Sequence, residues 1–313
     1  MASTLFNSSA CSAAAIPYPD LYGAEFLSLE ANLVTGFTQD IPIGYYANHG
    51  AVDVVNATYC NVTLTYTHPG ENDTVGVQVY LPRDTWNGRL QHIGGTAYAA
   101  GLDAAGIYGM LAAMGEGYAS VGTNAGHDPE AEPDSWGLIS PGNVNLYLLQ
   151  DLATVSLYEA SVIGKSVVNS YYGEEPVYSY YSGCSQGGRQ GYLLAQRYPD
   201  AYDGIAASSP AINWNSFFAG EYYPFLLMDE LSEYPAPCEF DAISEALLAA
   251  CDPLDGVTDS VISDPSVCDF DPYSMVGTLL NCTDTGSIVN VSETAAYISQ
   301  AACRSIPPPM PCY

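Results

Sequence analysis

The chain has 313 residues, 48% of them hydrophobic, which is enough to bury a large core. Its 35 Asp and Glu residues outnumber 6 Lys and Arg residues and give a formal net charge of −29, which argues against nucleic acid and anionic membrane surfaces as partners. No apolar run approaches the roughly 18 residues that span a bilayer, so the sequence predicts a soluble globular protein without a membrane partner.

The N-terminal residues, the cysteines and the glycosylation sequons indicate in which cellular compartment the protein folds. Residues 1–6 have neither the basic nor the apolar segment of a secretory signal peptide, and we expect that such a peptide was replaced by a start methionine. Nine cysteines and several N-x-S/T sequons indicate an oxidising secretory route. The sequence therefore predicts a secreted, extracellular glycoprotein with disulfide bonds. The sequons begin at Asn7, Asn56, Asn61, Asn72, Asn281 and Asn290.

Strands and helices are predicted to alternate over the first two thirds of the chain, from their hydrophobic periodicity and turn residues. This βαβ succession predicts an α/β fold, with a mainly parallel sheet and helices on both faces, of the α/β-hydrolase type. The predicted elements are two strands within 61–83 around a turn at 68–73, a strand at 88–93, a helix at 103–114, a strand at 118–123, a long helix at 144–168, a strand at 177–182, a helix at 190–198 and a strand at 203–208.

A turn between a predicted strand and a predicted helix carries the sequence Gly183-Cys-Ser185-Gln-Gly187. This is the setting of a G-x-S-x-G nucleophile elbow, which exposes the serine hydroxyl at the edge of the sheet. The serine occupies strained backbone, and the flanking glycines avoid collisions with the neighbouring strand or helix. Ser185 is therefore the candidate nucleophile.

A serine hydrolase also needs two backbone N–H groups that bind the oxyanion, and losing one such donor typically costs about 3 kcal/mol. Gln186, directly after the nucleophile, is the first candidate. The second is expected from the glycine-rich loop at 94–97, with Gly95 as the candidate, because glycines let the backbone approach a substrate closely. The alternative is a tight loop with no catalytic part.

The general base is not found among the four histidines. The α/β-hydrolase order is Ser, then Asp, then His, whereas His49, His68, His92 and His127 all precede Ser185. His68 lies in a predicted turn and His92 on a predicted strand, so we expect both to be structural. His127 remains a weak alternative for the base.

From about residue 211 the sequence changes to segments rich in Pro, Glu and Tyr. We therefore divide the chain into an incomplete α/β-hydrolase core at 1–210 and the beginning of an inserted lid domain at 211–313. A helix is predicted in this second part at 291–302.

The predicted lid contains a loop in which Asp252, Asp255 and Asp259 surround a glycine. Three carboxylates so close together repel one another without a cation, and a site made of oxygen atoms suits Ca²⁺. The alternative is a solvated acidic turn. Cys251 and Cys268 flank the loop, and a disulfide between them would stabilise the fold by about 3 kcal/mol in the chain-entropy model.

The residues around the elbow resemble the tannase/feruloyl esterase family of secreted esterases. Cys184 adjoins the candidate nucleophile, which is unusual for lipases but typical of that family, and the stretches 181–192 and 197–207 are similar to it nearly residue for residue. The resemblance extends from about residue 60 to about residue 302 and supports the α/β-hydrolase fold.

The resemblance also implies several pairings and ligands. In that family the elbow cysteine is bonded to a cysteine beside the catalytic histidine, Cys11 matches a cysteine that pairs with Cys60, and the backbone oxygens of Val257 and Val261 match calcium ligands. The family's Asp and His lie in a C-terminal half that we do not find here, and residues 303–313 break from the family pattern, so we expect a truncated chain. The sequence leaves the partners of these cysteines unassigned: Cys184, Cys238, Cys282, Cys303 and Cys312.

The resemblance thus implies a secreted serine esterase that cleaves small phenolic esters or feruloylated cell-wall polysaccharides through an acyl-enzyme, with Ca²⁺ as its cofactor. Feruloyl and galloyl esters remain equal alternatives for the substrate. Two other readings stay open. The chain could be an inactive calcium-binding glycoprotein fragment of such an esterase, or a serine peptidase on the same fold.

Overall fold

The computed structural model describes residues 10–304. The chain divides into two compact units, Met1–Ala211 and Ile212–Tyr313. The division lies next to the boundary that the change of sequence pattern indicates. The identity of the second unit as part of a lid stays a prediction.

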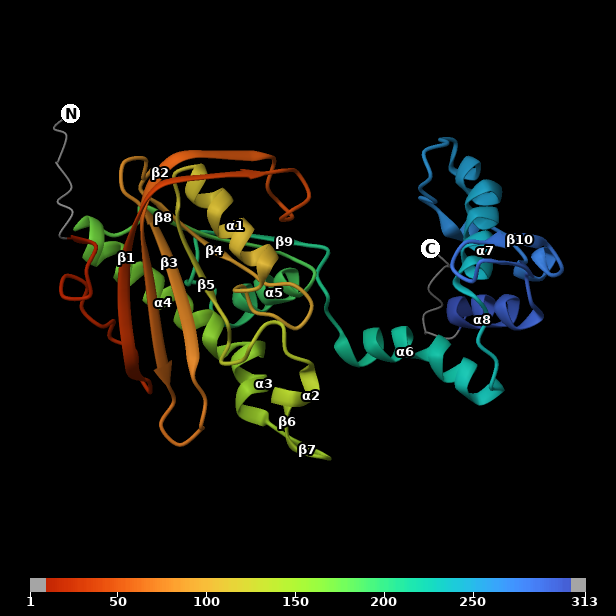
Figure 1. Ribbon diagram of the computed structural model, residues 1–313, viewed down its shortest axis with the longest axis horizontal. Helices are drawn as coiled ribbons and strands as arrows, with labels where there is room; N and C mark the ends of the chain where they lie inside the picture. The colour runs from red at the N-terminus through yellow and green to blue at the C-terminus, as the bar shows by residue number, and fades with distance from the viewer. Residues whose placement is uncertain (1–9, 305–313) are drawn as a thin grey trace. The chain divides into compact units, whose positions relative to one another are not determined.

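The first unit is built on a seven-stranded sheet in the order β1-β2-β3-β5-β4-β8-β9 (Figure 1). Strands β5, β4, β8 and β9 are parallel to one another, while β1, β2 and β3 are antiparallel and join the parallel part through the β3–β5 pair. The strands are β1 (Glu25–Ile41), β2 (Val52–Thr67), β3 (Val75–Pro82), β4 (Arg89–Ile93), β5 (Ala119–Thr123), β8 (Tyr178–Cys184) and β9 (Gly204–Ser208).

The expectation of a mainly parallel sheet is therefore only partly right, because the N-terminal half of the sheet is antiparallel. The turn between β2 and β3 spans residues 68–74, too short for the crossover that parallel neighbours need. Strand β1 was missed from the sequence. It is an edge strand whose residues are mostly half-buried or exposed, so it lacks a clear alternation of apolar and polar residues.

Helices cover both faces of the sheet, as expected (Figure 1). On one face α1 packs through Met110 against Ile93 and Tyr80, and on the other face α4 packs through Ile163 against Val79 and its neighbours. Consecutive residues of β3 thus point into opposite layers, as a strand's geometry requires. The helices of this unit are α1 (Ala104–Gly115), α2 (Pro133–Gly137), α3 (Leu146–Ala153), α4 (Val155–Tyr172) and α5 (Gln186–Arg197), with a small hairpin of β6 (Leu138–Ser140) and β7 (Asn143–Val144).

The long helix expected at 144–168 is in fact two helices, α3 and α4, which are separated at Thr154 (φ −159°, ψ −48°). The last carbonyls of α3 are bound from outside the helix, because the Arg189 guanidinium donates to the backbone oxygens of Leu152 and Ala153, at 3.0 Å each. A helix end needs such partners. The groups that cap this helix end belong to a distant residue, so the hydrophobic period alone did not show the break.

The second unit is formed by helices and a short hairpin around a small core of Ile243, Val291 and Ala295. The helix expected at 291–302 is α8. The elements are α6 (Trp214–Leu231), α7 (Pro237–Cys251), the 3-10 turns η2 (Asp252–Asp255), η3 (Pro265–Val267) and η4 (Pro272–Met275), β10 (Leu279–Cys282), β11 (Ser287–Asn290) and α8 (Glu293–Arg304).

Three disulfides are present in the described residues. The bonds Cys11–Cys60 and Cys251–Cys268 confirm the two expected pairings, and the structure adds Cys238–Cys282, which the sequence left open. Cys184 is a free thiol. Cys312 and the side chain of Cys303 lie outside the described residues, as does the sequon at Asn7. Between residues 10 and 304, no helix is both long and apolar enough to cross a membrane.

Candidate active site

Ser185 lies at the turn between the last residue of β8 and the first residue of α5. Its backbone has φ 58° and ψ −115°, a region that a residue with a side chain rarely adopts and that costs of order 1–3 kcal/mol. Hydrogen bonds hold it there: its N–H donates to the Ser208 oxygen (3.2 Å), and its oxygen accepts from the amides of Arg189 and Ala211 (3.0 Å each). The turn therefore presents the side chain at the carboxyl edge of the parallel strands.

The glycines on either side of Ser185 are needed for steric reasons. A Cβ at Gly183 would lie 2.5 Å from the carbonyl carbon of Gly187, and a Cβ at Gly187 would lie 3.1 Å from the backbone oxygen of Gly95. The first distance is closer than real Cβ contacts allow. The G-x-S-x-G spacing is thus explained by the tight crossing of β8, α5 and the 94–97 loop.

Gln186 is the first residue of α5, where backbone amides have no acceptor within the helix and the helix dipole is positive. Its side chain is held separately, because its Oε1 accepts from Arg189 Nε at 2.7 Å. The position of the Gln186 N–H suits a donor to an oxyanion formed at Ser185.

Gly95 follows β4, and its loop lies against the start of α5. The Gly95 oxygen accepts from the Gly187 amide (2.9 Å), while the Gly95 N–H donates to Oε1 of the fully buried Gln190 (3.2 Å). In this arrangement Gly95 anchors the loop to the nucleophile's helix. Because its N–H is engaged, the next amide, that of Thr96, is the alternative second donor to an oxyanion.

Gln190 is expected to be required for the stability of this loop. Replacing it by Met removes the acceptor of the Gly95 N–H and the donor to the Ala100 oxygen, which its Nε2 contacts at 3.2 Å. A buried polar group without a partner costs about 1–3 kcal/mol, so Gln190→Met should lower the free energy of unfolding by at least that amount in urea titrations. Gln196→Met, at an exposed position of the same helix, is the matched control. Equal effects of the two changes would contradict this role.

A segment between β1 and β2, which the sequence analysis did not single out, also supports the elbow. The Tyr46 hydroxyl donates to the oxygens of Ser182 (2.7 Å) and Gly94 (3.3 Å). Asn48 donates through Nδ2 to the Gly183 oxygen (3.2 Å), and its Oδ1 accepts from the Ser208 hydroxyl. No local motif marks these residues, because their partners are more than a hundred residues away or belong to another strand end.

The four histidines, all of which the structure describes, make no hydrogen bond to Ser185. His127 is buried, stacks on Trp136 and donates from Nε2 to the Tyr98 oxygen (2.9 Å), and burial lowers its pKa. His92 is hydrogen-bonded through Nδ1 to the Tyr202 hydroxyl, and burial lowers the pKa of His92 to about 3.

The other two histidines contact carboxylates instead. His49 is largely buried, with its Nδ1 3.6 Å from a Glu116 oxygen, and burial lowers its pKa. His68 lies between Asp73 and Glu159, at the turn that follows β2. The expectation that His68 and His92 are structural agrees with these contacts, and His127 also has a structural position.

The aspartate loop lies in the second unit and is closed by the Cys251–Cys268 disulfide. The Asp252 carboxylate accepts hydrogen bonds from the Asp259 amide (3.2 Å) and the amide after it. The pKa of Asp255 is lowered, mainly by a hydrogen bond from the Ser263 amide, so this carboxylate is charged at neutral pH.

The amides of Val257 and Val261 donate to Asp255 (3.0 Å) and Asp259 (3.1 Å), respectively. These short turns place carboxylate and carbonyl oxygens in one loop. Gly256, the residue before Val257, has φ +95°. The donor types, charged and neutral oxygens, are those that Ca²⁺ prefers. Within residues 10–304, however, the ligand atoms of Asp252, Asp255 and Asp259 do not come together within 4.8 Å of one another, and these carboxylates accept backbone amides instead.

Parallel strands, a serine in strained backbone at their carboxyl edge, and a helix that begins at the next residue define the first unit as an α/β hydrolase. The sequence of the chain matches the family model described as tannase and feruloyl esterase over residues 60–304, across both units. The chain therefore belongs to the tannase and feruloyl esterase family, as its elbow residues predicted.

Individual relatives agree with this assignment. The chain is 38% identical over 286 residues to a probable feruloyl esterase of Arthroderma benhamiae, covering 90% of this chain and 51% of the relative. It is 34% identical over 247 residues to a tannase of Aspergillus oryzae, covering 76% of this chain and 41% of the relative. A solved tannin acyl hydrolase from Aspergillus niger superimposes with a TM-score of 0.77 at 28% identity, covering 93% of this chain and 53% of that one. The chain thus spans about half the length of these relatives.

Proposed function

We propose that this chain carries the nucleophile and the oxyanion site of a serine carboxylic ester hydrolase. The observation that carries the proposal is the backbone of Ser185, held at φ 58° between β8 and α5 in a family of esterases. Such a strained residue is expected where function requires it. The test is whether Ser185→Ala abolishes ester hydrolysis in a protein in which this chain is completed to a full triad.

In the proposed reaction, Ser185 Oγ attacks the ester carbonyl carbon, and its proton passes to a general base. The negative charge that develops on the carbonyl oxygen is bound by the Gln186 N–H and by an N–H of the Gly95 loop, from Gly95 or Thr96. The carbon–oxygen bond to the alcohol then breaks, and the alcohol leaves with a proton. Water hydrolyses the acyl-enzyme and restores Ser185.

We propose phenolic esters as substrates, either small feruloyl or galloyl esters or feruloylated cell-wall polysaccharides. Support comes from relatives that are named feruloyl esterases and tannases. The net charge of −29 disfavours polyanionic substrates, because like charges repel.

Secretion is proposed on two grounds. Three disulfides are formed in the described residues, and such bonds persist in oxidising compartments. The sequon residues Asn56, Asn72, Asn281 and Asn290 are exposed, whereas Asn61 is half-buried. Exposed sequons of a secreted protein are acceptors for N-linked glycans.

We further propose that the aspartate loop binds Ca²⁺ through Asp252, Asp255 and Asp259, with backbone oxygens of Val257 and Val261. The ion would compensate the mutual repulsion of the carboxylates and fix the loop. We propose a structural role, because its five ligand positions include none of the residues assigned to the nucleophile or the oxyanion site.

Removal of calcium by EGTA is expected to lower the melting temperature of the second unit. A ligand at about 100 times its Kd stabilises a folded state by about 2.7 kcal/mol, so the shift should be several degrees in calorimetry. Asp252→Ala combined with Asp255→Ala should abolish the response to EGTA. Asp269→Ala combined with Asp284→Ala, at exposed positions of the same unit, should retain it. If EGTA left the melting temperature unchanged, the aspartate loop would be a solvated acidic turn without a bound ion.

A second candidate function is that of an inactive calcium-binding glycoprotein. The observation that favours it is that none of the four histidines contacts Ser185. The two candidates are distinguished by completing the chain with the C-terminal part of a relative: ester hydrolysis that is lost in Ser185→Ala supports the first, and no hydrolysis by the completed, folded protein supports the second.

A further inference from the structure

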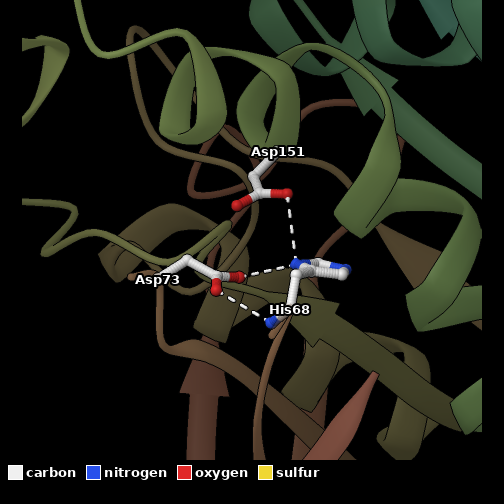
Figure 2. Close-up of side chains that lie close together, drawn as sticks. All are labelled: His68, Asp73 and Asp151. Atoms are coloured by element: carbon white, nitrogen blue, oxygen red, sulfur yellow. Dashed lines mark hydrogen bonds and ion pairs between the residues drawn. The ribbon is translucent and has the colours of Figure 1, made fainter. Parts of the chain in front are cut away.

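A buried cluster of charged side chains surrounds His68 at the turn between β2 and β3, and it includes none of the residues assigned above to the catalytic or the calcium site. His68 Nδ1 lies 2.6 Å from Asp73 Oδ2 and 3.9 Å from an oxygen of Asp151, and His68 Nε2 lies 2.9 Å from Glu159 Oε1. Figure 2 shows the carboxylates of Asp73 and Asp151 both directed toward the His68 ring. The cluster joins the hairpin to α3 and α4.

Asp151 is the residue in this cluster that the protein leaves uncompensated. It is 1% exposed, and its Oδ2 is buried without a hydrogen-bond partner. A buried carboxylate oxygen without a partner is costly, and native structures rarely keep one without a reason.

We propose that His68, Asp73 and Asp151 form a binding site for a divalent transition-metal ion, with Zn²⁺ as the matching probe. One ligand atom from each residue lies within 4.8 Å of the others. A movement of Asp151 toward His68, with a slight widening of the 2.6 Å contact between His68 Nδ1 and Asp73 Oδ2, brings all three within coordination distance of a single ion. The ion takes the place of the proton on His68 Nδ1. The buried Asp151 carboxylate, whose Oδ1 lies 3.9 Å from His68 Nδ1, then has a cation directly beside it.

The surroundings of the three ligands have the second layer of hydrogen bonds that metal sites need. His68 donates a hydrogen bond from Nε2 to Glu159 Oε1. The other oxygen of Glu159 accepts from the Tyr66 hydroxyl at 2.6 Å. Asp73 Oδ1 accepts from the Thr67 hydroxyl (2.9 Å), which leaves its Oδ2 for the ion. A carboxylate that binds the second ring nitrogen of a ligating histidine fixes its orientation and raises its basicity.

Charge and ligand type narrow the choice of ion. The carboxylates of Asp73, Asp151 and Glu159 surround a single histidine, so a dication compensates more of their charge than one proton can. One imidazole nitrogen among carboxylates suits Zn²⁺ better than Ca²⁺, which prefers oxygen ligands only. The partly exposed Glu71, 3.9 Å from His68 Nδ1, is placed to supply a fourth ligand from the solvent side.

The test is the titration of metal-free 313-residue protein with Zn²⁺ alone, followed by calorimetry and by thermal melting. We expect one equivalent to bind at this cluster and to raise the melting temperature of the first unit. Asp151→Asn should weaken this binding at least about tenfold, the scale of losses seen even for residues that only support a ligand. Asp134→Asn, at an exposed position of α2, is the matched control and should bind Zn²⁺ as the unchanged chain does.

The experiment must also distinguish Zn²⁺ binding at this cluster from Zn²⁺ binding at the aspartate loop of the second unit. Asp252→Ala combined with Asp255→Ala should leave the one-equivalent Zn²⁺ binding intact. Asp151→Asn keeps the shape of the side chain and removes a charge that has no partner, so the variant should fold, which circular dichroism can verify. Absence of binding to the unchanged chain, or equal binding to Asp151→Asn, would show that the cluster is only a buried ion pair.

Discussion

Replacing Ser185 by Ala is expected to abolish ester hydrolysis in a protein that has a complete triad. A suitable protein joins this chain to the C-terminal remainder of its 38% identical Arthroderma benhamiae relative, which this chain matches over 51% of its length. In subtilisin, loss of the serine lowers kcat by about 2 × 10⁶-fold, because the covalent route is no longer available. We expect a loss of similar size on methyl ferulate or methyl gallate.

The matched control in this joined protein is Ser140→Ala, at an exposed position of β6, which should keep full activity. The melting temperature of the Ser185→Ala variant should be close to that of the parent, because the hydrogen bonds that hold this turn are made by the backbone of residue 185, which alanine retains. Retention of more than a small fraction of the activity in a folded Ser185→Ala variant would rule out Ser185 as the nucleophile.

The 313-residue chain alone is expected to be nearly inactive on the same esters. His92 and His127 are buried and held by other groups, and burial lowers the pKa of each. His68 is held between two carboxylates, and His49 is largely buried beside Glu116. A serine site without its base and acid retains only about 10³–10⁴-fold acceleration over water from the oxyanion site and binding.

Product formation from methyl ferulate, followed by liquid chromatography over hours, measures this low rate. The joined protein, assayed in parallel, shows whether the assay detects a complete site. If the 313-residue chain turned over at a normal enzymatic rate, one of its four histidines would have to reach Ser185, and our account of their positions would be wrong.

The elbow could be predicted from sequence because its signal is local. The strand, the two glycines around Ser185 and the helix are contiguous, and each steric requirement concerns residues within a few positions or one neighbouring loop. The family resemblance added the Cys11–Cys60 pair, which no local pattern marks. The Cys251–Cys268 pair was predictable because its cysteines flank one loop.

Other features depend on partners far along the chain and were not predictable. The carbonyls at the helix break near Thr154 are bound by Arg189, and Tyr46 supports the elbow by binding Ser182 and Gly94. The position of the Gly95 N–H against Gln190 could not be seen either, because only the fold brings the loop after β4 against α5. Long-range packing therefore decides which amide of a glycine-rich loop is free.

The most direct test of the central claim is covalent labelling of the joined protein with a fluorophosphonate, followed by proteolysis and mass spectrometry. Such a reagent reacts with an activated serine and leaves a stable adduct on its oxygen. We predict a single adduct on the peptide that contains Ser185, and none in the Ser185→Ala variant. An adduct on a different serine, or equal labelling of the variant, would contradict the assignment of Ser185 as the nucleophile of this family member.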